Sequence, residues 1–170
     1  MYRIAAEKDK PEINRLRAQM GQIHADARPD LFKPNFRDGM EAYLDKFMET
    51  EGNEVYVCEE DGKILAMCMV KYYHKPDGVF SRARDYCQVS ELCVDENCRG
   101  QGIGTAMMQY LEELARQIGY EQMELEVVEG NDTAKRLYEK CGFVETGRRF
   151  RALKYDDGSY RDEFIMSRLL

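Results

Sequence analysis

The residues best suited to chemistry form a glycine-rich stretch, Arg99-Gly100-Gln101-Gly102-Ile103-Gly104. Glycines let the backbone turn sharply and let several N–H groups point at one anion without obstruction by Cβ atoms. The stretch lies between a β-rich run and a helical pattern, so the N-terminus of the following helix adds partial positive charge. This arrangement predicts a cradle for a phosphate or pyrophosphate group. A plain strand-to-helix turn is the alternative, since glycines punctuate many such turns.

Two better-known phosphate loops do not fit. A Walker A loop ends in Gly-Lys-Ser/Thr, whereas Gly104-Thr105-Ala106 has no lysine. A Rossmann fingerprint needs another glycine at the position of Met107 and a leading βαβ unit, but the strands expected before this loop are antiparallel. Neither nucleotide-binding fold is therefore predicted.

Hydrophobic periodicity predicts the elements that would position the loop. Asp9 and Glu12 have the spacing of an N-cap and capping box, and Asp61-Gly62 is a strong hairpin signal. Strands are expected at about 2–5, 54–58, 64–72, 85–94, 122–128, 144–153 and 160–169, and helices at about 9–23, 38–50, 103–118 and 131–141. The order β-α-α-β-β-β-α-β-α-β-β is that of an α/β (α+β) protein with a mixed sheet, antiparallel early, with one βαβ-like unit in the middle. We expect a single domain over residues 1–170.

Composition narrows the class of protein. The chain has 170 residues, 44% of them hydrophobic, which is enough for a core and excludes a disordered protein. The longest apolar run, 64–70, is far shorter than the roughly 20 residues of a membrane-spanning helix. No signal-peptide pattern is evident, so we expect a cytoplasmic protein without a membrane partner. The net charge of -7 argues against nucleic-acid binding and slightly favours a cationic partner.

The six cysteines give no metal signal. None are spaced as Cys-x-x-Cys, and the two histidines, His24 and His74, are the only ones that could join a zinc site. Several cysteines fall inside apolar runs, where cysteine acts as a small buried hydrophobe. Reduced thiols and no bound metal are expected.

A second motif, Asn131-Asp132-Thr133-Ala134-Lys135-Arg136-Leu137-Tyr138-Glu139-Lys140-Cys141-Gly142-Phe143, follows the loop. Together with Leu92-Cys93-Val94-Asp95 and the glycine loop, it resembles the signature of the GNAT superfamily of N-acetyltransferases. That signature is a strand, then Arg/Gln-x-x-Gly-x-Gly/Ala, then Asn-x-x-Ala-x-x-Leu-Tyr-x-x-x-Gly-Phe. The resemblance is strong from about Tyr86 to Phe143, whereas residues 1–50 match in element type alone.

The resemblance implies a GNAT-like acyl-CoA N-acyltransferase fold with acetyl-CoA as the donor. The pyrophosphate would rest on backbone N–H groups of the loop, and the pantetheine arm would pair with Leu92 and Val94 where two strands splay apart. Asn131 and Ala134 match positions that face this arm in relatives. The residues expected to bind acetyl-CoA are Leu92, Cys93, Val94, Arg99, Gly100, Gln101, Gly102, Ile103, Gly104, Thr105, Asn131, Ala134 and Tyr138.

The resemblance also implies catalytic residues for direct transfer within a ternary complex. Tyr138 would protonate the departing sulfur, and a backbone N–H around Cys93 or Val94 would stabilise the oxyanion. Glu91 is the first candidate for the base and Glu126 the second, with water alone as a third choice. Strand alternation puts Glu91 on the face of Cys93, opposite Leu92 and Val94. A tyrosine that only packs and a solvated strand glutamate are the alternatives.

Other features leave the acceptor open. The segment His24–Asp30 follows the first helix, where relatives build part of the acceptor pocket, and Arg148–Arg151 could meet a phosphate or an acidic acceptor or be a solvated strand face. The acceptor could be a polyamine, an aminoglycoside-like amine, a free amino acid or a protein N-terminus. The last hairpin could supply an edge for a homodimer. A non-catalytic acyl-CoA-binding or partner-binding module on the same fold is the competing interpretation.

Overall fold

The computed structural model describes residues 1–27, 39–154 and 157–170, with only the backbone described at 23, 24, 26 and 27. The strands form one seven-stranded sheet in the order β1-β2-β3-β4-β5-β7-β6. They are β1 (Tyr2–Ile4), β2 (Asn53–Glu60), β3 (Lys63–Lys75), β4 (Arg84–Val94), β5 (Gln122–Val128), β6 (Val144–Lys154) and β7 (Tyr160–Leu169). The α-helices are α1 (Lys10–Ala27), α2 (Met40–Glu49), α3 (Ile103–Gln117) and α4 (Asp132–Lys140), with short 3-10 turns η1 (Glu7–Asp9) and η2 (Glu96–Cys98).

The sheet is mixed, as the element order predicts. Strands β1 to β4 are joined as antiparallel neighbours, and β5, β7 and β6 are also antiparallel. The single parallel pair is β4 with β5, connected through α3. Strand β6 forms one edge of the sheet. The predicted βαβ unit is therefore β4-α3-β5.

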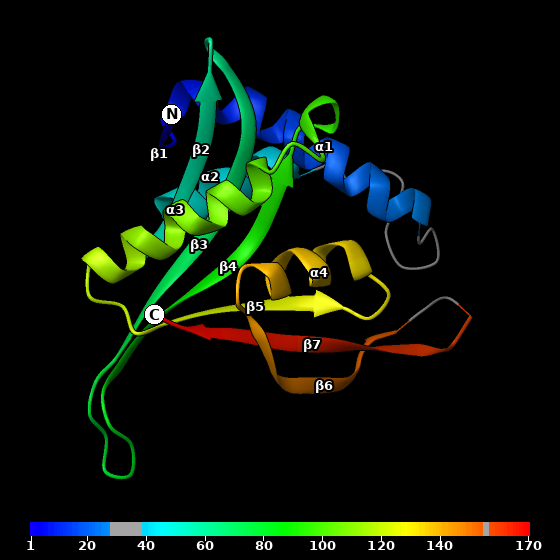
Figure 1. The fold of residues 1–170 in the computed structure, drawn as a ribbon. Coiled ribbons are helices and arrows are strands. Elements are labelled where there is room, and N and C mark those ends of the chain that lie inside the picture. Colours follow the sequence, from blue (N-terminus) through cyan, green and yellow to red (C-terminus); the bar gives the residue numbers. More distant parts are fainter. Residues whose placement is uncertain (28–38, 155–156) are drawn as a thin grey trace.

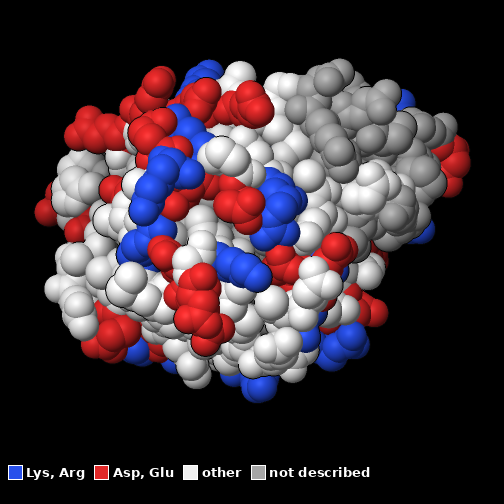
Figure 2. All heavy atoms as spheres, turned by 90° about the horizontal axis from the view of Figure 1, so that it is seen from above, with Lys and Arg blue, Asp and Glu red and all other residues white. Residues whose placement is uncertain are grey.

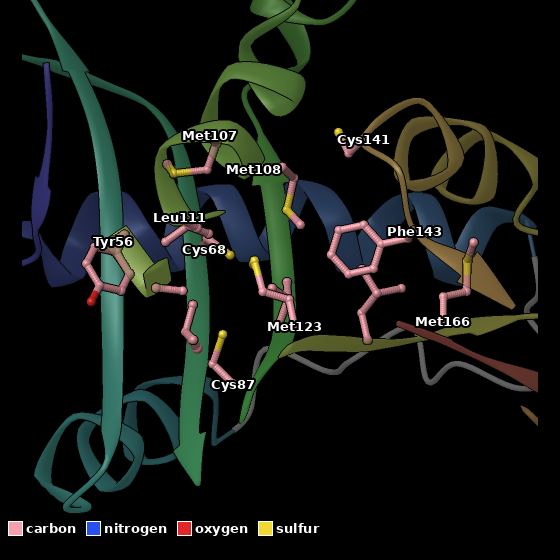
Figure 3. Close-up of a cluster of buried hydrophobic side chains, with 14 of the residues drawn as sticks. Tyr56, Cys68, Cys87, Met107, Met108, Leu111, Met123, Cys141, Phe143 and Met166 are labelled. Atoms are coloured by element: carbon pink, nitrogen blue, oxygen red, sulfur yellow. The ribbon is translucent and has the colours of Figure 1, made fainter. Parts of the chain in front are cut away.

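Helices cover the two faces of the sheet unequally (Figure 1). On one face, α1 and α2 pack against β2 and β3 through a cluster that includes Ile13, Leu44 and Met67. On the other face, α3 and α4 cover a larger cluster that spans β2 to β7. This second cluster is rich in sulfur (Figure 3), with buried Met107, Met108, Met123, Met166, Cys68 and Cys87. Cysteines expected in apolar surroundings are indeed part of the core.

The first helical segment starts earlier than the sequence pattern predicts. Asp9 was expected to be the N-cap, but it is the last residue of η1 and its carboxylate accepts the N–H of Ala6 at 2.7 Å. The side chain of Asp9 also lies 2.6 Å from a guanidinium nitrogen of Arg3, in β1. Asp9, paired with Arg3, therefore lies three residues after the actual N-cap, Ala6.

This ion pair predicts how stability depends on pH. The hydrogen bonds from Arg3 are the main cause that lowers the pKa of Asp9 below its ordinary value of 3.8. A carboxyl group with a lowered pKa in the folded state stabilises the protein above its unfolded-state pKa, and this contribution is lost as the pH falls below that value. Between about pH 5 and about pH 2, wild type should therefore lose more stability in urea unfolding than Arg3→Met does. Parallel losses in the two proteins would contradict the assignment.

The expected hairpin is also confirmed. Asp61 and Gly62 both have positive φ, at 48° and 75°, as required in the two-residue hairpin between β2 and β3. Among the described helices, none combines the length and the apolar character needed to cross a membrane. The sequence segment 155–156 within the last hairpin lies outside the described residues.

Candidate active site

The glycine loop connects η2 to α3 with a backbone that only glycine adopts readily. Gly100 and Gly102 have φ values of 75° and 84°, in the left-handed region. Gly102 occupies the N-cap of α3 without a capping side chain, so the first N–H groups of the helix are not covered by one. A Cβ at Gly104 would lie 3.0 Å from Cδ1 of Leu137, so this glycine lets α3 approach α4 closely. The glycines therefore set the conformation of the loop that begins α3.

Asp95 anchors the start of this loop. It is buried, and its carboxylate accepts the N–H of Asn97 at 2.9 Å, which caps η2. The other carboxylate oxygen accepts a hydrogen bond from Arg15 of α1 at 2.6 Å. At the far side of the turn, Nε of Arg99 donates to the carbonyl of Val94 at 3.2 Å. These contacts hold the loop against the end of β4.

Strands β4 and β5 separate near this loop. Their parallel pairing covers Tyr86 to Val89 on β4 and Gln122 to Leu125 on β5, and pairing ends there. Beyond this point β5 pairs on its other side with β7, and β4 pairs on its other side with β3. Figure 1 shows the two strands diverging toward the loop end of β4. The main chain at Leu92 and Val94 therefore has no strand neighbour on the side of β5, as expected for a splayed pair.

Strand geometry distinguishes Cys93 from Val94 as a donor. The N–H of Asp95 donates to the carbonyl of Leu65, in β3, at 2.8 Å. In a strand, N–H groups two residues apart point the same way, so the N–H of Cys93 also points toward β3. The N–H groups of Leu92 and Val94 then point toward the gap. Of the two residues proposed for the oxyanion, Val94 has the suitable direction and Cys93 does not.

Tyr138 is carried into this region by α4. Although part of the residue is exposed, its pKa is raised above the ordinary value, first because burial removes water and then because the thiols of Cys68, Cys93 and Cys141 lie nearby. Its ring packs against Phe143 with centroids 6.0 Å apart. A phenol with a raised pKa stays protonated at neutral pH, so it keeps a proton to donate.

Glu91 lies on the opposite face of β4 from Leu92 and Val94, as strand alternation predicts. Leu92 and Val94 pack against the cluster beneath α3, whereas both carboxylate oxygens of Glu91 accept from Arg17 of α1, at 2.8 and 3.1 Å. A bulge in β4 decides that Glu91 points to the face covered by α1. Val89 pairs with Val70 and Glu91 with Met69, so the intervening residue has no partner. Without that bulge, Glu91 would face the same side as Val89.

Glu91 and Tyr138 both interact electrostatically with the thiols of Cys68 and Cys93. Burial is the main cause that raises the pKa of Cys93, and the charge of Glu91 adds to it. Burial likewise raises the pKa of Cys68, with Glu91 among the smaller causes. The same thiols contribute to the raised pKa of Tyr138. Glu91, on β4, and Tyr138, on α4, therefore lie near the same region of β3 and β4.

The remaining motif residues have structural partners. Oδ1 of Asn131 accepts the N–H of Ala134 at 3.2 Å and caps α4, which leaves the amide NH₂ group as the part of this side chain that could meet a ligand. Ala134 is partly buried against the larger core cluster. Both residues lie at the N-terminus of the helix that carries Tyr138.

Other candidates are less suited to catalysis. Glu126 is exposed on β5 and bound by Arg149 at 2.7 Å, and Arg149 also pairs with Glu163. Arg148 pairs with Asp162 at 2.6 Å, so both arginines have carboxylate partners within the sheet. Of the segment 24–30, the structure describes the helical backbone through 27, and the side chain of His24 and residues 28–30 lie outside the described part.

Arg17 is the site residue that sequence reasoning missed. It is one of the few buried charged residues, with 9% of its surface exposed. The sequence contains a signal that Arg17 is buried, because Ile13, Leu16, Arg17 and Met20 have the i, i+3, i+4, i+7 spacing of a buried helix face. An arginine within such a stripe needs a buried partner.

The charges of the surface are mixed. On the face shown in Figure 2, Lys and Arg side chains lie among Asp and Glu rather than in one basic field. Within the described part of the chain, no group of three or more His, Cys, Asp and Glu residues is arranged to hold a metal ion.

The fold and this site define an α/β protein with a glycine-rich loop at the mouth of a splayed parallel strand pair. The model of the acetyltransferase (GNAT) family matches residues 20–143, so the chain belongs to that family of transferases.

Known proteins agree with this membership. The chain is 28% identical over 123 residues to a putative phosphinothricin acetyltransferase of Bacillus subtilis, covering 71% of each chain. It is 42% identical over 77 residues to a chloroplastic GCN5-related N-acetyltransferase of Arabidopsis thaliana, covering 44% of this chain but only 26% of the plant protein. A tetramutant of the BH1408 protein from Bacillus halodurans superimposes with a TM-score of 0.79 at 28% identity, over 86% of this chain and 95% of that one.

Proposed function

We propose that this protein transfers the acetyl group of acetyl-CoA to a primary amine by direct transfer in a ternary complex. The observation that carries the proposal is the open side of β4, where the β4–β5 ladder ends at Val89 and Leu125 beside the glycine loop. An extended arm can pair there with the main chain of Leu92 and Val94, while a diphosphate meets the N-terminus of α3. The residues from Arg99 to Thr105 would hold the diphosphate, and the amide of Asn131 and Ala134 would face the arm.

The side chains supply what the reaction needs. An ammonium acceptor first loses a proton, through water, to the carboxylate of Glu91. The amine nitrogen then attacks the thioester carbonyl carbon, and the N–H of Val94 stabilises the negative oxygen. The C–S bond breaks as the sulfur takes a proton from Tyr138, which recovers it as the attacking nitrogen loses its second proton. The products are the acetylated amine, free CoA and one proton.

The acceptor classes that we propose follow from the reaction and from the name of one relative. The relative from Bacillus subtilis is named for phosphinothricin, an amino acid with a free amine, so amino-acid-like amines belong beside polyamines, aminoglycosides and peptide N-termini. We further propose that the whole chain acts as one domain in the cytoplasm.

The test is acetyl-CoA consumption against a panel of these amines. Free CoA should be separated by chromatography, because the six cysteines of the protein would react with a thiol dye. Release that depends on one class of amine supports the proposal and identifies the acceptor. Calorimetric binding of acetyl-CoA without release of CoA for any amine would favour the alternative, a non-catalytic acyl-CoA-binding module. The observation that favours this alternative is that the carboxylates of Glu91 and Glu126 are both paired with arginines.

The choice of base can be tested with a matched pair of variants. Glu91→Gln should lower kcat/KM for the amine by about 10²-fold, the lower range for loss of a general base. Glu126→Gln should change it by no more than about twofold, since the carboxylate forms an exposed ion pair with Arg149. Equal losses would point to electrostatic attraction of the amine, and a larger loss in Glu126→Gln would assign the base to Glu126.

A further inference from the structure

Arg17 joins three elements beside the candidate site. From α1, its guanidinium group binds both oxygens of Glu91 on β4, through Nε at 2.8 Å and Nη2 at 3.1 Å. Its Nη1 donates to the carbonyl of Met40, the first residue of α2, at 3.1 Å, and also lies 3.3 Å from Oδ1 of Asn14. The ring of Tyr43 lies 5.0 Å from the guanidinium carbon. Four partner residues therefore fix one arginine in a single orientation.

The geometry of the pair restricts Glu91 in turn. Two parallel N–H···O bonds from a planar guanidinium hold a carboxylate in one plane, which an ammonium group cannot do. Each carboxylate oxygen accepts one bond from Arg17 and retains a second lone pair. The side chains of Arg17 and Glu91 are only 9% and 17% exposed, so water weakens the pair little. Glu91 thus offers its remaining lone pairs in a fixed direction.

The groups that face Glu91 are few. Arg17 approaches from α1 and Tyr43 from α2, and within the sheet the thiols of Cys93 and Cys68 lie in electrostatic range. Arg17 is the one cation among these four groups of the described chain.

We propose that Arg17 is a positioning residue for acetyl transfer, which holds the carboxylate of Glu91 in one orientation toward the acceptor amine. The inference rests on the proposed function, in which Glu91 receives the proton of that amine. Arg17 touches no reacting atom, and its effect reaches the reaction only through Glu91.

The experiment compares Arg17→Met, Arg17→Lys, Glu91→Gln and the double variant Arg17→Met/Glu91→Gln. Arg17→Met should lower kcat by about 10²-fold, the loss expected from a misplaced catalytic group, with the KM for acetyl-CoA unchanged. Arg17→Lys, which keeps the charge but not the planar fork of N–H groups, should show a smaller loss of kcat. The double variant should be no slower than Glu91→Gln alone.

Arg3→Met is the matched control. Arg3 also binds a buried carboxylate with two nitrogens, at 2.6 and 3.0 Å from Asp9, but it lies on β1, at the edge of the sheet. It should lose stability as Arg17→Met does and keep the wild-type kcat. If Arg17→Met also keeps the wild-type kcat, or if the losses of the single variants multiply in the double variant, Arg17 is only structural. Should Arg17→Met not fold, Arg17→Lys decides: a wild-type kcat would overturn the proposal.

A second readout does not depend on turnover. Carbon-13 NMR of labelled glutamate side chains follows the carboxylate of Glu91 without any acceptor, with Glu91→Gln to assign the signal. In Arg17→Met that signal should shift and broaden at constant pH, because the carboxylate is no longer held in one orientation, and an unchanged signal would overturn the proposal. A wild type that acetylates no amine would instead contradict the proposed function, and the NMR result would still decide whether Arg17 orients Glu91.

Discussion

Tyr138→Phe is expected to lower kcat by about 10²- to 10⁴-fold, the range for loss of a general acid. The substitution removes one oxygen and keeps the ring that packs against Phe143, so the fold and the affinity for acetyl-CoA should remain. Burial, helped by the nearby thiols, raises the pKa of Tyr138. The phenol therefore stays protonated through neutral and moderately alkaline pH, and wild-type activity should not fall from loss of this proton below about pH 10.

Steady-state kinetics and calorimetric binding of acetyl-CoA would check this expectation. Tyr120→Phe is the control, because Tyr120 is another partly buried tyrosine that packs against a ring, that of Tyr72, outside the site. It should retain wild-type turnover. If Tyr138→Phe also retains it, Tyr138 only packs and another donor, or water, must protonate the sulfur.

Gly102→Ala should weaken acetyl-CoA binding by at least about tenfold, roughly 1.4 kcal/mol, while the protein still folds. At φ 84°, an alanine costs about 1–2 kcal/mol of backbone strain, and the loop would relax away from the conformation that directs its N–H groups at one anion. An added Cβ meets no protein atom within 4 Å, so no packing clash accounts for the loss.

Gly119→Ala provides a control with the same strain. Gly119 has φ 88°, follows the end of α3, and its Cβ would also meet nothing within 4 Å. Both variants should lower the melting temperature by a few degrees, at about 2–4 °C per kcal/mol for a chain of this size. Only Gly102→Ala should change the calorimetric Kd for acetyl-CoA. Equal affinities in the two variants would mean that the loop is an ordinary turn.

Much of the fold was predictable because its signals are local. Alternation located β5 and β7 at their observed bounds, and the paired positive φ angles of Asp61 and Gly62 are what an Asp-Gly turn requires. The glycine loop and the motif ending in Gly142-Phe143 could likewise be recognised from neighbours in sequence. The start of the first helix could not, because Arg3, on another element, pairs with Asp9 and shifts its role.

The sequence alone determined which elements form, where the flexible backbone of the anion loop lies, and which residue types could serve as acid and base. These depend on interactions within a few residues, such as helix and strand periodicity and the conformational freedom of glycine. The tertiary structure decided how these parts meet. A single unpaired residue in β4 turns Glu91 toward Arg17, 74 residues away in sequence, and the end of pairing with β5 exposes the N–H of Val94 to the gap. Such contacts arise only when distant strands choose a register, and no local pattern specifies that choice.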